Sequence, residues 1–351
     1  MIFFTDAFRS RVVVTSVVAA TVAFGPVFTV IARAVPVNGA GSTFVQPLLG
    51  LYAAQIKQQY PDLVINYQGI GSGGGINQMI AGTVDFAGSD VAMKDSQAAQ
   101  VTKGVVFVPV AGGPVAIVYN LSGVTNLKLS RTVLPAIFDG QITNWNDPKI
   151  AADNPGVNLP NQPIKLVVRA DSSGTSYITT NHLSSVDPYF KGRVGVSTTP
   201  NWVGKPLRGK GNPGIAQIVR QTPGTIGYVE AEYAKKNNLA AALVQSKQGT
   251  FLAPNLDDAN AALKTVQFNG DYRVNFSQLG DPANGYPISG LTWIMVYKSY
   301  TAPGKADAIK KMVQWSLTKG QALNSQLGYT QIPSDVANQI VQTVNSSVTG
   351  P

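Results

Sequence analysis

Three loops of the sequence combine glycine with hydroxyl side chains at points where a strand or loop leads into a helix. They are Gly-Ser-Thr-Phe at residues 41–44, Gly-Ser-Gly-Gly at 71–74 and Ser-Ser-Gly-Thr at 172–175. The first turn of a helix leaves backbone N–H groups unpaired and carries partial positive charge, and glycine lets an anion approach the backbone closely. Any one of these loops could equally be an ordinary helix cap. The three together predict an anion-binding site.

Two kinds of charge accompany these loops. Arg169 precedes Ser173 by four residues and offers a planar fork of donors for a tetrahedral oxyanion, with Asp171 holding the guanidinium in place. The alternative is a plain surface ion pair. Asp90 ends an apolar segment, and a carboxylate repels a bound anion unless that anion donates a proton, which phosphate can do at neutral pH and sulfate cannot. Unless Asp90 is only a helix cap, it predicts a site for a protonated oxyanion.

Other chemistries fit the sequence less well. The glycines of GIGSGG at residues 69–74, with Asp90 downstream, satisfy a dinucleotide-binding fingerprint, but the helix that follows is short for that fold. A hydrolase would need His182, the sole histidine, to activate Ser72 or Ser173, and the motif G-x-S-x-G is absent. No cluster of residues has the spacing of metal ligands. We therefore expect a binding protein without catalytic residues, cofactor or metal.

The elements expected around these loops alternate between strand and helix, as in an α/β protein. We expect helices near residues 48–56, 76–81, 177–183, 308–317 and 334–344, and strands near residues 63–67, 85–90, 105–110, 115–119, 164–168, 224–229 and 291–297. The strands at 105–110 and 115–119 flank Gly112-Gly113-Pro114 and could carry the chain from one domain into a second. A chain of 351 residues is long enough for two domains.

The composition is that of a globular protein with a positive balance. Hydrophobic residues make up 44% and charged residues 13%, and the formal net charge is +9. The positive charge suits an anionic ligand, and no dense Lys/Arg run or basic-aromatic platform favours nucleic acid. The absence of cysteine excludes disulfides, thiol catalysis, Cys-ligated zinc and a lipid-modified Cys anchor.

The N-terminal segment has the layout of a secretory signal. Arg9 and Arg11 precede a long apolar stretch over residues 12–31, which ends at Ala-Arg-Ala at residues 32–34. We expect residues 1–34 to be a signal peptide; a retained membrane anchor is the alternative. A free, unlipidated exported binding protein stays with the cell only where an outer membrane confines it, so we expect a periplasmic location.

Several longer motifs carry a family resemblance. The segments GAGSTF, NYQGIGSGGGINQMIAGTVDFAGSD, RADSSGTS, PGTIGYVE and YPISGLTWIMVYK resemble, in order, those of the phosphate-binding proteins of Pst ABC transporters. The resemblance spans residues 38–344. Two departures are slight: Gly73 stands where many members have a second Ser, and Ser172 stands where many have Gly.

The resemblance implies a fold, a function and a set of ligand residues. It implies a periplasmic-binding-protein type II-like α/β fold with two crossovers and a hinge cleft between two domains, the first at residues 35–110 plus 290–351 and the second at 111–289. Inorganic phosphate would be the ligand, a membrane ABC permease the partner, and the protein a monomer. The family's phosphate-binding residues fall on Thr43, Phe44, Ser72, Asp90, Arg169, Ser173, Gly174 and Thr175, with Asp171 orienting Arg169. Binding of another oxyanion and an exported phosphatase remain alternatives.

Overall fold

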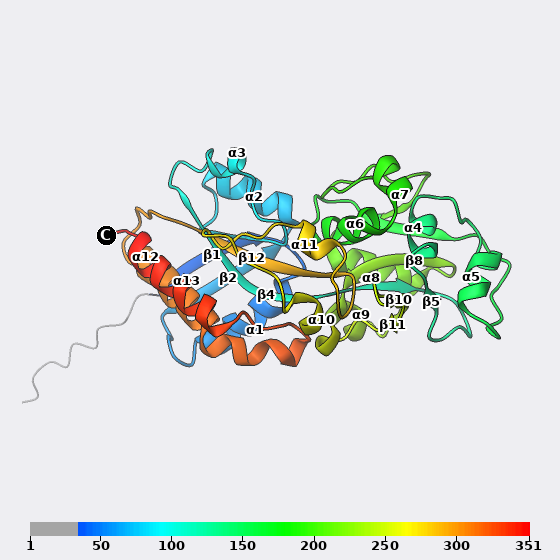
Figure 1. Ribbon diagram of the computed structural model, residues 1–351. Helices are drawn as coiled ribbons and strands as arrows, with labels where there is room; N and C mark the ends of the chain where they lie inside the picture. Colours follow the sequence, from blue (N-terminus) through cyan, green and yellow to red (C-terminus); the bar gives the residue numbers. More distant parts are fainter. Residues whose placement is uncertain (1–33) are drawn as a thin grey trace, which may run out of the picture. The chain divides into compact units, whose positions relative to one another are not determined.

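A long buried strand, β4 (Val105–Tyr119), runs through the middle of the fold in the computed structural model (Figure 1). The structure describes residues 34–351, which cluster as one unit; the predicted signal peptide, apart from Ala34, lies outside the described residues. Instead of the two expected strands, β4 is continuous through Gly112-Gly113-Pro114. It pairs with β12 (Ser289–Tyr297) up to Pro114 and with β8 (Thr225–Glu230) from Val115 onward. The glycines and the proline thus mark a change of partner along one strand.

The main sheet has nine strands in the order β2-β1-β3-β12-β4-β8-β6-β7, with β9 paired to β4. The remaining strands of this sheet are β1 (Val35–Gly41), β2 (Leu63–Gly69), β3 (Phe86–Ser89), β6 (Lys165–Arg169), β7 (Leu207–Gly209) and β9 (Ala240–Ala241). A second sheet holds β5 (Lys128–Leu129), β10 (Leu243–Gln245) and β11 (Phe251–Leu252). The main sheet contains both parallel and antiparallel strand pairs, as is common in α/β folds.

Helices from both ends of the described chain gather in one half of the fold, and helices from its middle gather in the other (Figure 1). The first half holds α1 (Gln46–Ile56), α2 (Ser72–Ala81), α3 (Asp95–Ala98), α12 (Lys305–Leu317), η1 (Lys319–Leu327) and α13 (Ser334–Ser347). The other helices are α4 (Val133–Phe138), α5 (Pro148–Asp153), α6 (Gly174–Val186), α7 (Pro188–Arg193), α8 (Gly211–Gln221), α9 (Ala231–Lys236), α10 (Leu256–Leu263) and α11 (Ser277–Gly280). Among the described residues, no helix is long and apolar enough to cross a membrane.

The strand directions bring the predicted loops together. Strands β1, β2 and β3 are mutually parallel, and β3 and β4 both run antiparallel to β12, so β3 and β4 point the same way. Strands β6, β7 and β8 are also mutually parallel, and β8 runs antiparallel to β4. The carboxyl ends of the two sets therefore point toward each other. Since α/β proteins bind ligands at the carboxyl ends of their strands, the site is expected where these two sets of ends meet.

Candidate anion-binding site

The predicted site residues come from these facing strand ends and are buried together. Loop residues Thr43 and Phe44 follow β1, Ser72 begins α2 after β2, and Asp90 follows β3. From the other set, Arg169 ends β6, and Ser173, Gly174 and Thr175 begin α6. Thr43, Phe44, Ser72, Asp90, Arg169, Ser173 and Thr175 are between 0% and 4% exposed, and Gly174 is also buried.

Asp90 is a buried carboxylate surrounded by hydroxyl donors. Its Oδ2 accepts a hydrogen bond from Ser42 Oγ at 2.7 Å, and its Oδ1 accepts one from Thr292 Oγ1 at 2.8 Å. Burial raises the pKa of Asp90 to about 6, while the hydrogen bonds from Ser42 and Thr292 and the charge of Arg169 act to lower it. At neutral pH the group is mainly ionised and can accept a proton from a ligand.

Arg169 is held by Asp171 in the way that the sequence predicts. Its Nε donates to Asp171 Oδ1 at 2.9 Å, its Nη2 donates to Asp171 Oδ2 at 2.5 Å, and its Nη1 donates to Thr175 Oγ1 at 3.1 Å. Burial acts to raise the pKa of Asp171, but the hydrogen bonds and charge of Arg169 outweigh it, so the pKa is lowered. A guanidinium has five N–H groups. Within residues 34–351 three of them have protein partners, which leaves two for a ligand.

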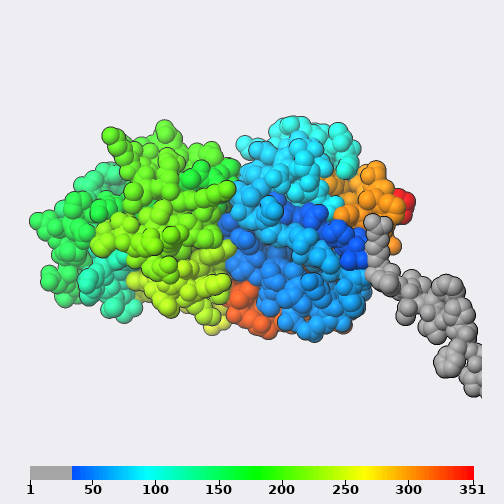
Figure 2. All heavy atoms as spheres, turned by 180° about the vertical axis from the view of Figure 1, so that it is seen from behind, coloured from blue at the N-terminus to red at the C-terminus, as the bar shows by residue number. Residues whose placement is uncertain are grey.

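Hydrogen bonds join the two sets of loops directly. Gly174 N donates to Ser72 Oγ at 3.1 Å, and Tyr233 Oη donates to the carbonyl of Thr43 at 2.7 Å. In the space-filling view, the blue and cyan atoms near the N-terminal end of the described chain abut the green atoms from its middle (Figure 2). The predicted site thus lies inside a closed arrangement, and the Phe44 N–H is already paired with Ser42 Oγ at 2.9 Å.

Two glycines are needed for this close approach. A Cβ on Gly174 would lie 2.4 Å from Asp90 Oδ2 and 2.5 Å from Ser72 Oγ, too close for any side chain. Gly71 has a φ of +89°, and its Cβ would lie 2.3 Å from Asp171 Oδ2. Glycine at these positions lets residues from the two sets of strand ends come into contact.

The two departures from the family pattern lie against each other. Gly73 N donates to the carbonyl of Ser172 at 3.1 Å, and a Cβ on Gly73 would lie 2.2 Å from Ser172 Oγ. A serine at residue 73 would therefore collide with the serine at residue 172. In this chain the side chain of Ser172 thus occupies the space that a side chain at residue 73 would need.

Two further residues contact the predicted site residues and were not expected from the sequence. Thr292 lies on β12, where the pairing of Trp293 with Ser89 brings it beside Asp90. Asn212, at the start of α8, reaches Thr43 and Thr175 with its side chain. A hydroxyl inside an apolar strand is a detectable signal for Thr292, and a fourth strand-to-helix junction is one for Asn212. Neither signal identifies the partner, which depends on the pairing of distant strands.

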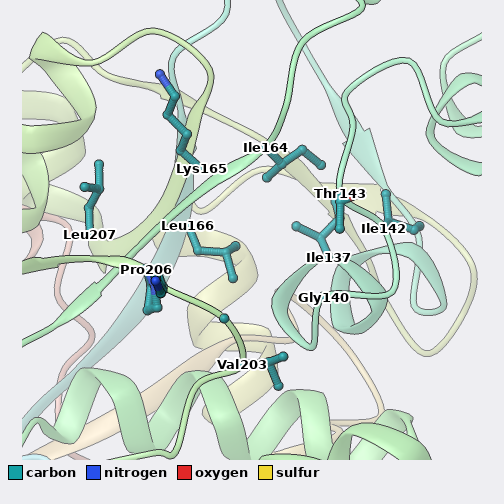
Figure 3. Close-up of a pocket in the computed structure, with 12 residues that line it drawn as sticks. Ile137, Gly140, Ile142, Thr143, Ile164, Lys165, Leu166, Val203, Pro206 and Leu207 are labelled. Carbon is teal, nitrogen blue, oxygen red and sulfur yellow. The ribbon is translucent and has the colours of Figure 1, made fainter.

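A groove of about 340 Å³ elsewhere in the molecule has a different character (Figure 3). Its walls carry aliphatic side chains such as Ile137, Ile142, Leu166 and Val203, and it contains none of the predicted anion-binding residues. Thr143, Lys165 and Lys205 also line the groove, but no carboxylate that could accept the proton of an oxyanion is among its lining residues. The buried cluster around Asp90 is therefore the better candidate for the site.

His182 has no part in the site. The side chain is 1% exposed, and its Nδ1 lies 2.8 Å from the carbonyl oxygen of Gly280. Burial lowers the pKa of His182 to about 4, so the ring is neutral near pH 7. Within the described residues, no group of three or more His, Cys, Asp or Glu residues is placed to hold a metal ion.

Comparison with known proteins defines the class and then the family. Residues 25–319 match the family described as the PBP superfamily domain, which agrees with the α/β fold. A high-affinity periplasmic phosphate-binding protein, PfluDING, solved with phosphate, is similar in fold with a TM-score of 0.73 and 20% identity, covering 88% of this chain and 94% of that chain. A substrate-binding protein from Clostridium perfringens, solved with phosphate, has a TM-score of 0.62 at 19% identity and covers 85% of this chain and 100% of that chain.

Relatives with higher sequence identity show the family more narrowly than the structural comparisons do. The phosphate-binding protein PstS of Pasteurella multocida is 37% identical over 319 residues, covering 89% of this chain and 91% of the relative. PstS of Methanocaldococcus jannaschii is 33% identical, covering 88% of this chain and 85% of the relative. The chain belongs to the PstS family, which confirms the family resemblance. These relatives are named as binding proteins rather than as enzymes.

Proposed function

We propose that the protein binds inorganic phosphate with high affinity and delivers it to the membrane permease of an ABC phosphate importer. Membership of the PstS family supports this function. The observation that carries the proposal is the buried carboxylate of Asp90 in a site that otherwise presents hydrogen-bond donors, including the guanidinium of Arg169. A single acceptor among many donors is the complement of an anion that still carries a proton.

The binding mechanism follows from this arrangement. Phosphate loses its water and is held by hydroxyl and backbone donors and by the two free N–H groups of Arg169. Asp90 accepts the proton of the bound phosphate. Sulfate has no proton at neutral pH, so one of its oxygens would face the ionised carboxylate without a hydrogen bond. Loss of such a bond, with the repulsion that replaces it, can give discrimination of about 10⁴ to 10⁵.

The closed arrangement is the loaded state in this proposal. Domain I would comprise residues 35–110 and 290–351, and domain II residues 111–289, with β4 and the start of β12 as the crossovers. The contacts of Ser72 with Gly174 and of Thr43 with Tyr233 support this division, because each would join one domain to the other. Opening would separate these partners and release phosphate, and the permease would distinguish the loaded form by its closed shape.

The setting of the protein is also part of the proposal. Residues 1–34 would be removed as a signal peptide, and the mature protein would act as a monomer in the periplasm. The similarity in fold to a protein named as periplasmic supports the location. The permease and phosphate are its partners, and nucleic acid is not.

Calorimetric titration of the purified, phosphate-stripped protein tests the function. Tight one-to-one binding of phosphate, with no heat from sulfate, is expected. Equal binding of the two anions would retain an oxyanion site but reject the role of Asp90. A lack of binding of phosphate would reject the proposed function, and hydrolysis of a phosphate ester would favour the phosphatase alternative.

A further inference from the structure

Asn212 is a fully buried amide in the site that the family resemblance does not assign. It follows β7 at the first turn of α8 and is 0% exposed. Its side chain makes three hydrogen bonds, and two of them are to hydroxyls predicted to bind the anion, those of Thr43 and Thr175. Asn212 therefore affects which hydrogen bonds the Thr43 and Thr175 hydroxyls can still make to a ligand.

The orientation of the amide is fixed by a backbone donor. The N–H of Glu230 points at one end of the Asn212 side chain at 3.0 Å, so that end must be the acceptor Oδ1. The other end is therefore Nδ2, which carries two hydrogens. It lies 2.9 Å from Thr43 Oγ1 and 3.3 Å from Thr175 Oγ1. Asn212 thus donates one hydrogen to each hydroxyl.

These bonds fill the acceptor capacity of both hydroxyls. A hydroxyl oxygen has two lone pairs and one hydrogen. Thr43 Oγ1 accepts from Asn212 Nδ2 and also from the Asn212 backbone N at 3.0 Å. Thr175 Oγ1 accepts from Asn212 Nδ2 and from Arg169 Nη1. Within residues 34–351 neither hydroxyl donates to a protein atom, so the remaining hydrogen of each is available for a ligand.

The acceptor capacity of the Ser72 hydroxyl is also filled, but by different groups. Its Oγ accepts from the backbone N of Asp90 at 3.2 Å and from the backbone N of Gly174 at 3.1 Å. Its hydrogen can therefore only be donated, and within residues 34–351 it is donated to Asp90 Oδ2 at 3.4 Å, whereas the hydrogens of Thr43 and Thr175 have no protein acceptor. Ser72 owes this restriction to two backbone groups, whereas Thr43 and Thr175 owe it to one shared side chain.

We propose that Asn212 is a positioning residue that forces the Thr43 and Thr175 hydroxyls to donate to the bound anion, leaving Asp90 as the acceptor. This inference rests on the proposed function, phosphate binding. It extends that function by naming the residue that sets the direction of these hydrogen bonds. Asn212 reaches Thr43 across the contact between the two sets of strand ends, so the direction is set in the closed arrangement.

Removal of the amide has a consequence that depends on pH. In Asn212→Ala each hydroxyl regains one free lone pair and can accept the second proton of H₂PO₄⁻. The variant therefore loses less affinity for this form than for HPO₄²⁻. Titratable or charged groups around Asn212 come from several elements: Arg169, Asp171, Asp90, Glu230 and Tyr233. All of them are present in both proteins, so the ratio of variant to wild-type affinity at each pH largely removes their contribution.

The experiment measures phosphate Kd by calorimetry at about pH 5.5 and about pH 8.5, on either side of the second ionisation of phosphate. For Asn212→Ala we expect a loss of about 100-fold at the higher pH and about 10-fold at the lower pH, the size expected for one or two hydrogen bonds. The control is Asn154→Ala. Asn154 is 3% exposed and bonds Lys128 and Ile150 outside the site, so its loss should leave Kd unchanged at both pH values. An equal loss at both pH values for Asn212→Ala would overturn the inference.

A second variant guards against misfolding of the first. Asn212→Asp keeps the shape of the side chain and the acceptor for Glu230 N, but its carboxylate would accept the hydrogens of Thr43 and Thr175. It should bind phosphate more weakly than Asn212→Ala at about pH 8.5, and binding within about threefold of wild type would contradict the inference. Failure of the wild-type protein itself to bind phosphate would reject the proposed function, and the inference with it.

Discussion

The two sides of the site are built from different chemistry. On the side of β1, β2 and β3, the charged group is Asp90, an acceptor buried among hydroxyls. On the side of β6, the charged group is Arg169, which Asp171 holds at the start of α6. A cation and a helix N-terminus attract any oxyanion, whereas a buried carboxylate tolerates only one with a proton to donate. In the proposed function, the Arg169 side would supply affinity and the Asp90 side would supply selectivity.

Asp90→Asn should have the largest effect, and it acts on selectivity. An amide can donate a hydrogen bond to an oxygen of sulfate, so the preference for phosphate over sulfate should fall by about 10⁴ or more. Competition calorimetry with both anions measures the change. Asp139→Asn is the matched control, because Asp139 is also fully buried but bonds Gln141 outside the site. Unchanged selectivity in Asp90→Asn would remove the distinction between the two sides.

Arg169→Gln should weaken the binding of phosphate and of sulfate to the same extent. The change removes two charge-assisted hydrogen bonds to the ligand and should cost about 10³ in affinity. Measured in the Asp90→Asn background, where sulfate also binds, the loss should be equal for phosphate and sulfate. Arg131→Gln, which breaks the bidentate contact of Arg131 with Asp281, serves as the control. A larger loss for one anion would show that Arg169 also selects.

The stability of the ligand-free protein should reveal the cost of ionising Asp90. Its pKa rises from 3.8 to about 6 on folding, so the folded state retains a proton that the unfolded state has lost. This contribution to stability is present below about pH 4 and is lost as the pH rises through 6, a change of about 3 kcal/mol. In urea unfolding, Asp90→Asn should gain stability relative to wild type by about that amount between about pH 4 and about pH 7. If the difference in unfolding free energy between Asp90→Asn and wild type did not change with pH, burial would not raise the pKa of Asp90.

Asp171→Asn should have the smallest effect on binding. The amide oxygen can still accept from Arg169 Nε and from Gly211 N, which both donate to Oδ1, but the bond from Arg169 Nη2 to Oδ2 and the negative charge are lost, so the guanidinium is held less firmly. We expect affinity for phosphate to fall about tenfold with selectivity over sulfate intact. Titration with both anions measures this. A change in selectivity would mean that Asp171, like Asp90, helps to distinguish phosphate from sulfate, rather than only holding Arg169 in place.

Local signals made part of this site predictable. The glycine and hydroxyl residues lie at strand-to-helix junctions, and the sequence shows such junctions directly because glycine and helix-capping residues mark them. The pairing of Arg169 with Asp171 is also local, since only one residue separates them in the sequence. The structure places these residues close together.

Contacts set by distant strands were not predictable in the same way. The path of β4 through Gly112-Gly113-Pro114 depends on its exchange of β12 for β8, because proline is tolerated in a strand where no partner needs its N–H. Likewise, Thr292 reaches Asp90 only because β12 lies beside β3. These features depend on strand order, which no single segment of the sequence encodes.

A neutron crystal structure of the phosphate complex would show whether Asp90 accepts the proton of bound phosphate, because neutron diffraction locates hydrogen atoms. We expect a hydrogen between a phosphate oxygen and an Asp90 carboxylate oxygen, with the two oxygens about 2.5 to 2.7 Å apart, and hydroxyl hydrogens directed toward the other phosphate oxygens. A phosphate bound with no oxygen in hydrogen-bonding distance of Asp90 would contradict it.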